Sequence, residues 1–492
     1  MGAYIRWYER RIEKKLRDDA TRGISPPSSE PVQLGVPQAD NTVTDRRQLV
    51  PPLGLKEYWY PALPARRVKS SKPLFWQMLG EELALFRDAN GDIAAVSDVC
   101  PHRGASMARG DCFYKGTISC PYHGATFDAS GECTAFLPEG PDSKMPGQLK
   151  IRTYPTRTLR GWVFIWMGEG EPAPIEEDVP PELFDEKSSI FLTTYTYWPC
   201  NWMLAIENQN DSHNGMYVHR NSLMQLMMYR GRSRTPLGPR SKLILDRALT
   251  PLMKNQNYYA NKETGKEPLQ LFYPGIKDYW PIGNWRTAVW ALFKPWYKLV
   301  YNKWRLSPKR YPYTAPEEWA ADVGVSAWHL PCMVRVNFGV FAFTRSAVPV
   351  SANLSRVVYF HHRKRAPFGW LGELWQRAWF FAYFNYWLHY NFSGADGTVA
   401  APCRYWTEEN LSSTDSHLVM LRKLVTERSR DAKRNADRAA PDSPAGDIRF
   451  FQMQREQGVA HEQSLDEAAQ HTESAPGMEF VVGTPKLRKE KQ

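Results

Sequence analysis

Two short segments of the chain combine cysteine and histidine in nearly the same order. Residues 100–104 read Cys-Pro-His-Arg-Gly, and residues 120–124 read Cys-Pro-Tyr-His-Gly, with seventeen residues between the first histidine and the second cysteine. Two thiolates and two imidazoles make four metal ligands, the number that a [2Fe–2S] cluster needs for its two irons. The closing glycines permit tight turns around such a group. The predicted cluster ligands are Cys100, His102, Cys120 and His123.

A structural zinc ion is the main alternative, because two cysteines and two histidines also suit zinc. Zinc fingers space these ligands differently and do not repeat the Cys-Pro and glycine frame. In Rieske centres, two thiolates hold one iron and two neutral imidazoles hold the other, which raises the reduction potential above that of all-cysteine ferredoxins. The repeated frame favours a Rieske cluster, placed at the tip of a small β domain.

A second metal site is predicted further along the chain. Only two histidines, His213 and His219, lie between residues 124 and 328, and Asp211 precedes them. Two histidines and one carboxylate on one face hold a mononuclear non-haem iron and leave positions open for O₂ and substrate. The carboxylate should come from later in the chain, where Asp396, Glu408 and Glu409 are candidates, and a resemblance to a known family, given below, implies Asp396. The alternative is that Asp396 only caps a turn.

Composition limits the class of protein. The chain has 492 residues, of which 42% are hydrophobic and 23% charged, as in a globular protein of two domains with extensions. The net charge of +11 is spread along the chain without a basic stripe, so docking of an acidic electron carrier explains it better than nucleic-acid binding. Seven widely spaced cysteines do not suggest a disulfide framework. The first residues lack the apolar run of a cleavable signal, and we expect a cytoplasmic protein.

The local pattern divides the chain into five parts. Residues 1–54 form an arm or linker, residues 55–168 carry short strand-like runs with a hairpin signal at Asn90-Gly91, and residues 169–188 are a proline-rich, acidic linker. Residues 189–427 combine strand patterns with helical segments at Trp202–Val218 and Ser413–Glu427, and residues 428–492 are mostly disordered.

Two aromatic stretches raise the question of membrane contact. Residues 285–304 and 370–392 are rich in tryptophan and tyrosine but are interrupted by charged residues. Packing around a large apolar pocket is the favoured interpretation, and peripheral membrane contact is the less favoured one.

Residues 55–425 resemble the large (α) subunit of Rieske non-haem iron oxygenases. The resemblance rests on the paired cluster motif, on residues 161–174, and on the stretch from Asn201-Trp202 through Glu207-Asn208 to the two histidines. It implies an α+β fold, with a small β Rieske domain followed by a catalytic domain built on an antiparallel sheet with helices, of the helix-grip type. It also implies catalytic roles for Asn208 and Asp211, with Asp211 linking the two metal sites across neighbouring subunits of a homotrimer or an α₃-containing ring.

The spacing of the proposed iron ligands departs from the family pattern. The family usually places the first histidine three residues after the aspartate and the second four or five residues later. Here His213 follows Asp211 by two residues, His219 follows six later, and Asn214 stands at the usual position. A local helix bulge that turns His213 onto the metal, ligation by Asn214, and loss of the iron are the three alternatives.

The resemblance implies an oxygenase. Electrons from NAD(P)H would reach the cluster through a separate reductase or ferredoxin, pass to the Fe(II), and activate O₂ to hydroxylate, dihydroxylate or oxidatively demethylate a hydrophobic, aromatic or polycyclic substrate. Ala105 and Tyr122 exclude the disulfide of respiratory Rieske proteins, and Ala125 replaces their hydroxyl donor, which implies a lower potential. The alternative is an electron-transfer or regulatory protein without a working mononuclear iron.

Overall fold

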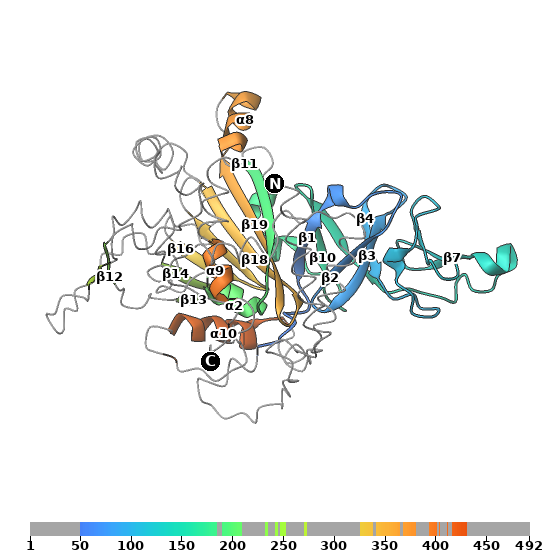
Figure 1. Cartoon of the computed structure of the whole chain (residues 1–492), viewed down its shortest axis with the longest axis horizontal. Helices are drawn as coiled ribbons and strands as arrows, with labels where there is room; N and C mark the ends of the chain where they lie inside the picture. Colours follow the sequence, from blue (N-terminus) through green and yellow to red (C-terminus); the bar gives the residue numbers. More distant parts are fainter. Residues whose placement is uncertain are drawn as a thin grey trace, which may run out of the picture.

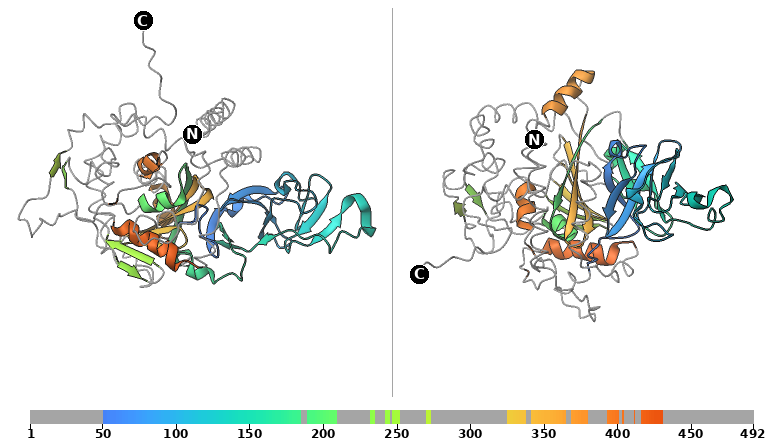
Figure 2. Two further views of the ribbon diagram at one scale, coloured as in Figure 1. Left: turned by 90° about the horizontal axis from the view of Figure 1, so that it is seen from below. Right: turned by 45° about the vertical axis from the view of Figure 1, so that its right-hand side comes forward.

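The computed structural model describes most of two β-rich domains. The described residues are 50–184, 189–208, 325–337, 341–364, 368–379, 393–400 and 416–430, four short strands between residues 232 and 272, and the single positions 403 and 411. The N-terminal domain, residues 50–184, extends from one side of the larger sheet of the C-terminal domain, residues 189–430 (Figures 1 and 2).

The N-terminal domain consists of short antiparallel strands in three small sheets, ordered β1-β10-β9, β2-β3-β4-β8 and β5-β6-β7. The strands are β1 (Trp59–Pro64), β2 (Leu74–Met78), β3 (Glu81–Arg87), β4 (Ile93–Ser97), β5 (Thr117–Ser119), β6 (Ala125–Asp128), β7 (Cys133–Phe136), β8 (Thr153–Tyr154), β9 (Thr156–Leu159) and β10 (Trp162–Trp166). The hairpin predicted at Asn90-Gly91 is confirmed, because β3 pairs with β4 and Gly91 adopts a φ of 91°.

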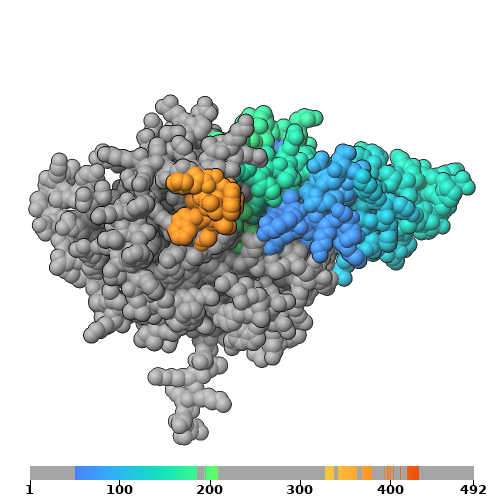
Figure 3. Space-filling model, turned by 90° about the horizontal axis from the view of Figure 1, so that it is seen from above, coloured from blue at the N-terminus to red at the C-terminus, as the bar shows by residue number. Residues whose placement is uncertain are grey.

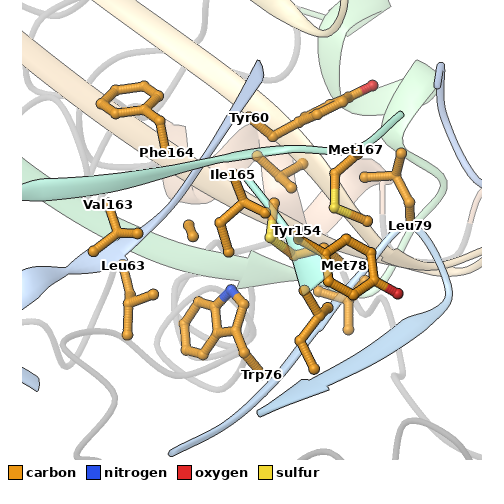
Figure 4. Close-up of a cluster of buried hydrophobic side chains, with 14 of the residues drawn as sticks. Tyr60, Leu63, Trp76, Met78, Leu79, Tyr154, Val163, Phe164, Ile165 and Met167 are labelled. Carbon is orange, nitrogen blue, oxygen red and sulfur yellow. The ribbon is translucent and has the colours of Figure 1, made fainter. Parts of the chain in front are cut away.

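The core of this domain explains why its apolar runs form strands. All five residues of β10 are buried, and β10 lies between β1 and β9. Figure 4 shows the side chains that meet there, drawn from strands at both ends of the domain sequence. They include Tyr60, Leu63, Trp76, Met78, Tyr154, Val163, Ile165 and Met167, each at most 5% exposed.

The C-terminal domain is built on a seven-stranded antiparallel sheet. Its order is β11-β19-β18-β17-β16-β14-β13. The strands are β11 (Ser189–Trp198), β13 (Lys242–Ile244), β14 (Arg247–Pro251), β16 (Val325–His329), β17 (Met333–Asn337), β18 (Phe341–Ser351) and β19 (Leu354–Lys364), while β12 (Arg232–Arg234) pairs separately with β15 (Gln270–Phe272). The predicted strand patterns at 334–343 and 356–362 fall in β17, β18 and β19.

The two faces of this sheet have different neighbours, because successive side chains of a strand alternate. On one face, Phe360 of β19 packs edge-on against Trp162 of the N-terminal domain, with ring centroids 5.3 Å apart. On the other face lie α2 (Trp202–Glu207) and α9 (Gly394–Ala400), and α10 (Ser416–Arg428) runs alongside (Figure 1). The predicted α+β fold with an antiparallel catalytic sheet is confirmed.

Helix α8 (Gly369–Trp379) projects from this body (Figure 1), and its atoms, orange in Figure 3, lie at the surface. Several of its apolar side chains are exposed. Trp370 and Trp375 are 73% and 62% exposed, whereas the polar Gln376 is only 5% exposed. The predicted packing of these aromatics around an apolar pocket is therefore wrong for α8. Among the described helices, none has the length and apolar character to cross a membrane.

Candidate metal centres

The two cysteine–histidine segments fold into the same backbone turn. In the first, the Cys100 amide donates to the Ala105 carbonyl at 2.8 Å, and the Gly104 amide donates back to the Cys100 carbonyl at 2.8 Å. In the second, Cys120 and Ala125 are joined at 2.8 Å, and the Gly124 amide donates to the Cys120 carbonyl at 3.0 Å. The two loops therefore share one six-residue frame.

Both closing glycines need the left-handed backbone that the sequence predicts. Gly104 has a φ of 75° and Gly124 a φ of 66°. A side chain at either position would be strained, because residues with a Cβ rarely adopt this conformation. The glycines thus fix where each loop turns back from the ligand positions.

The four predicted cluster ligands lie close together at these turns. The rings of His102 and His123 are 4.8 Å apart between centroids, at an interplanar angle of 73°. Cys100 and Cys120 are 2% and 4% exposed, and their thiols are hydrogen-bonded to each other. Two buried sulfur atoms beside two histidine rings provide the donor set of a Rieske cluster.

The closeness of these four side chains shifts the pKa values of both thiols and leaves one imidazole nitrogen buried. The hydrogen bond between the thiols lowers the pKa of Cys120 to about 6 and raises that of Cys100. Nδ1 of His123 is buried and, among the described residues, has no hydrogen-bond partner. A buried polar atom without a partner is costly, so a metal bound at this nitrogen would relieve that cost.

The described residues contain no group of three or more histidine, cysteine or acidic side chains that could hold one metal ion. The donor set fits a [2Fe–2S] cluster.

An exposed aromatic stack covers the histidine side of this centre. Tyr122 stacks on His123 with centroids 3.8 Å apart and an interplanar angle of 27°, and it is 57% exposed. The guanidinium of Arg103 lies 5.5 Å from the Tyr122 ring centroid. This ring covers part of a proposed cluster ligand that is itself half-buried.

Most of the predicted second site lies outside the described residues. These positions are Asp211, His213, Asn214 and His219, with the competing acids Glu408 and Glu409. The predicted helix at 202–218 is described only as α2, which begins at Trp202 and ends at Glu207. Asn208, at the C-terminal end of α2, is half-buried.

Asp396 lies in the first turn of α9 and is 3% exposed. Its Oδ2 atom is 3.9 Å from Nη1 of Arg345, which is itself fully buried. The alternative that Asp396 only caps a turn stays a prediction beside the ligand role, because a carboxylate in the first turn of a helix can serve either purpose. A buried carboxylate paired with a cation suits a ligand role, although its histidine partners are outside the described residues.

The sequence pattern does not indicate the buried ion pair that holds α2 against α10. Arg422 of α10 donates from Nε to Oε1 of Glu207 at 2.7 Å and from Nη2 to Oε2 at 3.2 Å. The two residues are 215 positions apart. Their pairing depends on how α10 packs, which residue types alone do not specify.

Comparison with known proteins agrees with this architecture. Residues 58–155 match the family model of the Rieske [2Fe–2S] domain, and residues 166–235 match that of a homotrimeric ring hydroxylase. The terminal oxygenase component of carbazole 1,9a-dioxygenase from a Sphingomonas species is 34% identical over 173 residues, which cover 35% of this chain and 45% of that protein.

Relatives with other activities match to a similar extent. The oxygenase component of dicamba O-demethylase from Stenotrophomonas maltophilia is 33% identical over 34% of this chain and 48% of its own length. The 4beta-methylsterol monooxygenase from Methylococcus capsulatus is 34% identical over 36% of this chain and 48% of its own. The chain thus matches somewhat less than half the length of each of these relatives.

Solved structures match over a longer span and establish the fold. The carbazole-bound oxygenase in a ferredoxin complex of carbazole 1,9a-dioxygenase has a TM-score of 0.59 at 20% identity, covering 80% of this chain and 95% of that one. The terminal oxygenase of carbazole 1,9a-dioxygenase from Nocardioides aromaticivorans has a TM-score of 0.57 at 21% identity, and the match covers 79% of this chain and 97% of that one.

The paired loops and the two-domain architecture define an iron–sulfur protein of the Rieske class with a second antiparallel domain. Residues 58–155 form a Rieske [2Fe–2S] domain, residues 166–235 match the homotrimeric ring hydroxylase model, and the fold is that of Rieske oxygenase terminal components.

Proposed function

We propose that this chain is the terminal oxygenase component of a Rieske oxygenase system. The observation that carries the proposal is the pair of matched ligand loops in one chain with a buried carboxylate on α9. An electron-transfer protein would need the first feature but not the second. Helix α2, which leads into the segment of the two histidines, packs on the same sheet face as α9.

Four residues would hold the cluster and three would hold the iron. The cluster ligands are Cys100, His102, Cys120 and His123, and the proposed iron ligands are His213, His219 and Asp396. When bound, the two groups supply one-electron transfer and activation of O₂ against a C–H bond or an aromatic ring. Asn208 and Asp211 are the proposed catalytic residues beside the iron. Burial of Asp396 keeps water from competing for its carboxylate.

The substrate is proposed to be hydrophobic, and either aromatic or polycyclic. The relatives include a dioxygenase, a demethylase and a monooxygenase at 33% to 34% identity, so the reaction type is not fixed by relatedness. The same ligand set serves all three reactions, and the shape of the pocket distinguishes them.

The proposed partners are further copies of this chain and an electron carrier. The matched ring hydroxylase family is described as homotrimeric, and a similar structure contains a ferredoxin complex. A trimer would let Asp211 of one subunit approach a cluster histidine of the next. The electron source is proposed to be NAD(P)H, through a reductase and ferredoxin, and the net charge of +11 suits an acidic carrier.

Iron and acid-labile sulfide analysis of the purified full chain tests this function. About three irons per two sulfides are expected, because the cluster takes two irons and the second site takes one. About two irons per two sulfides would contradict the oxygenase and favour the electron-transfer alternative.

Two neighbouring substitutions test which side chain binds the iron. His213→Ala is expected to lose the third iron, and Asn214→Ala is expected to retain it. Retention in the first variant and loss in the second would show that Asn214 is the ligand. The sulfide content serves as the control, since neither change touches the cluster loops.

A further inference from the structure

One buried arginine contacts both described elements next to the proposed iron ligands. Arg345 of β18 is fully buried. Its Nη2 atom donates a hydrogen bond to the Ala205 carbonyl of α2. Its Nη1 atom lies 3.9 Å from Oδ2 of Asp396 in α9. A single guanidinium therefore spans the space between the two helices.

On the α2 side, Arg345 satisfies a carbonyl at the end of a helix. The last carbonyls of a helix have no partner within it. Arg345 supplies one for Ala205, and the indole of Trp328 supplies another by donating to the Ile206 carbonyl at 3.0 Å. Both donors come from the sheet, so the end of α2 is fixed directly before Asn208. The segment of His213 and His219 starts from this fixed point.

On the α9 side, Arg345 belongs to a cluster of buried polar side chains that also contains Tyr359, Ser393 and Asp396. Tyr359 stands opposite it in the register of β18 and β19 and is also fully buried. The ring of Trp198 lies 4.8 Å from the guanidinium carbon. Among the described residues, Nε and Nη1 of Arg345 have no hydrogen-bond partner, so the link to Asp396 is the attraction of opposite charges at 3.9 Å in a site shielded from solvent.

We propose that Arg345 is a positioning residue, which sets the end of α2 and the carboxylate of Asp396 against each other. This inference rests on the proposed function, in which Asp396 is an iron ligand. The planar guanidinium offers donors in two directions at fixed geometry, and a lysine ammonium on its flexible stem does not. Residues that orient metal ligands in this way commonly change metal affinity 10- to 100-fold when they are replaced.

A matched control lies on the neighbouring strand. Arg335 of β17 is also fully buried and pairs with the buried Glu182, but it lies on the opposite face of the sheet, away from α2 and α9. Replacement of either arginine by methionine removes one buried cation from the same sheet. A general loss of stability would therefore affect both variants.

The test is a titration with Fe(II) of full-length protein that keeps its cluster but has been freed of the third iron by a chelator. We expect Arg345→Met to bind Fe(II) about 10- to 100-fold more weakly than the wild type and Arg335→Met to bind it unchanged, with equal sulfide contents. Arg345→Lys keeps the charge and is expected to lose about tenfold. If the methionine variant does not fold, the titration of Arg345→Lys still tests the inference.

Equal Fe(II) affinity in the Arg345 and Arg335 variants would overturn the inference and leave the proposed function standing. Failure of the wild type to bind a third iron would refute the proposed function and the inference together. Weakened binding in the Arg345 variants alone supports both.

Discussion

At the scale of single residues, the two cluster loops differ mainly in where the histidine stands. His102 is the third residue of its loop and His123 the fourth, while the cysteine, glycine and alanine keep the same places in both. The backbone hydrogen bonds are accordingly the same in both loops. The offset lets two equal turns present their imidazoles from different directions, with the rings at 73° to each other.

The closing glycines provide a test of this frame. A Cβ on Gly124 would meet the side chain of Leu137 at 2.9 Å, whereas a Cβ on Gly104 would meet no atom within 4 Å. Left-handed backbone alone costs an alanine roughly 1–2 kcal/mol. Gly124→Ala should therefore lower the thermal stability and the sulfide content more than Gly104→Ala does. Gly124→Ala combined with Leu137→Ala should recover part of the loss, and equal effects of the two single changes would contradict the frame.

The cluster loops could be predicted from the types and spacing of their residues. The ligand spacing and the glycines determine both loops locally, so no distant contact was needed to predict them. Arg345 gave no such signal, since a strand pattern indicates its burial but not the two helices that meet it. Tyr122 is similar, because its stacking on His123 depends on how the loop folds.

At the scale of elements, α2 depends on its neighbours more than on its own sequence. It has only six residues, and isolated helices of that length are unstable in water. Asn201 caps its start by accepting from the Met203 amide at 2.9 Å, and its side-chain amide donates to the carbonyls of Pro52 and Ala352 at 3.1 and 2.8 Å. The N-terminal segment, the sheet and α10 all contact this one short helix.

The ion pair between α10 and α2 gives a prediction for stability. Arg422 and Glu207 are 1% and 6% exposed in their side chains. Removing one partner of such a buried pair leaves an uncompensated charge and costs about 3–5 kcal/mol. Urea denaturation of Arg422→Met should show a loss of this size. Lys423→Met breaks the exposed pair with Glu427 on the same helix and should change stability by less than about 1 kcal/mol, so similar losses would contradict the account.

The periodicity of apolar residues predicted where strands and helices lie, but not in every case what their apolar faces contact. It located the long strands and α10, because burial on one face imposes a repeat on the sequence. It misled at α8, where the aromatic residues suggested a core and the structure exposes Trp370 and Trp375. A hydrophobic pattern shows which side chains share a face, and it does not show what that face meets.

At the scale of the whole molecule, a buried acid joins three distant segments. Asp178, near the end of the N-terminal domain, contacts the C-terminal domain and is 2% exposed. Its Oδ2 atom accepts from the Trp59 amide of β1 at 2.9 Å and from Nη1 of Arg430, just after α10, at 2.9 Å. The two domains and the end of α10 therefore meet at one carboxyl group.

This junction predicts a pH dependence of stability. Burial raises the pKa of Asp178 from 3.8 to about 6, against the opposing hydrogen bonds from Arg430 and Trp59. Between these values the folded state binds more protons than the unfolded state, so the contribution of Asp178 falls as the pH rises from about 4 to about 6. Relative to Asp178→Asn, the wild type should lose up to roughly 3 kcal/mol across this range and change little above it. Melting curves of both proteins would measure this, and a relative gain with rising pH would contradict it.

The proposed function requires that one chain combine an electron-accepting cluster with an oxygen-activating iron. O₂ uptake and product formation, measured together with a reductase, a ferredoxin and a panel of hydrophobic aromatic substrates, test it most directly. We expect product matched to O₂ consumed in the wild type, and no product from Cys100→Ser, which lacks a proposed cluster ligand, or from His219→Ala, which lacks a proposed iron ligand. Product formation that persists in His219→Ala, or cluster reduction without product from any substrate, would contradict it.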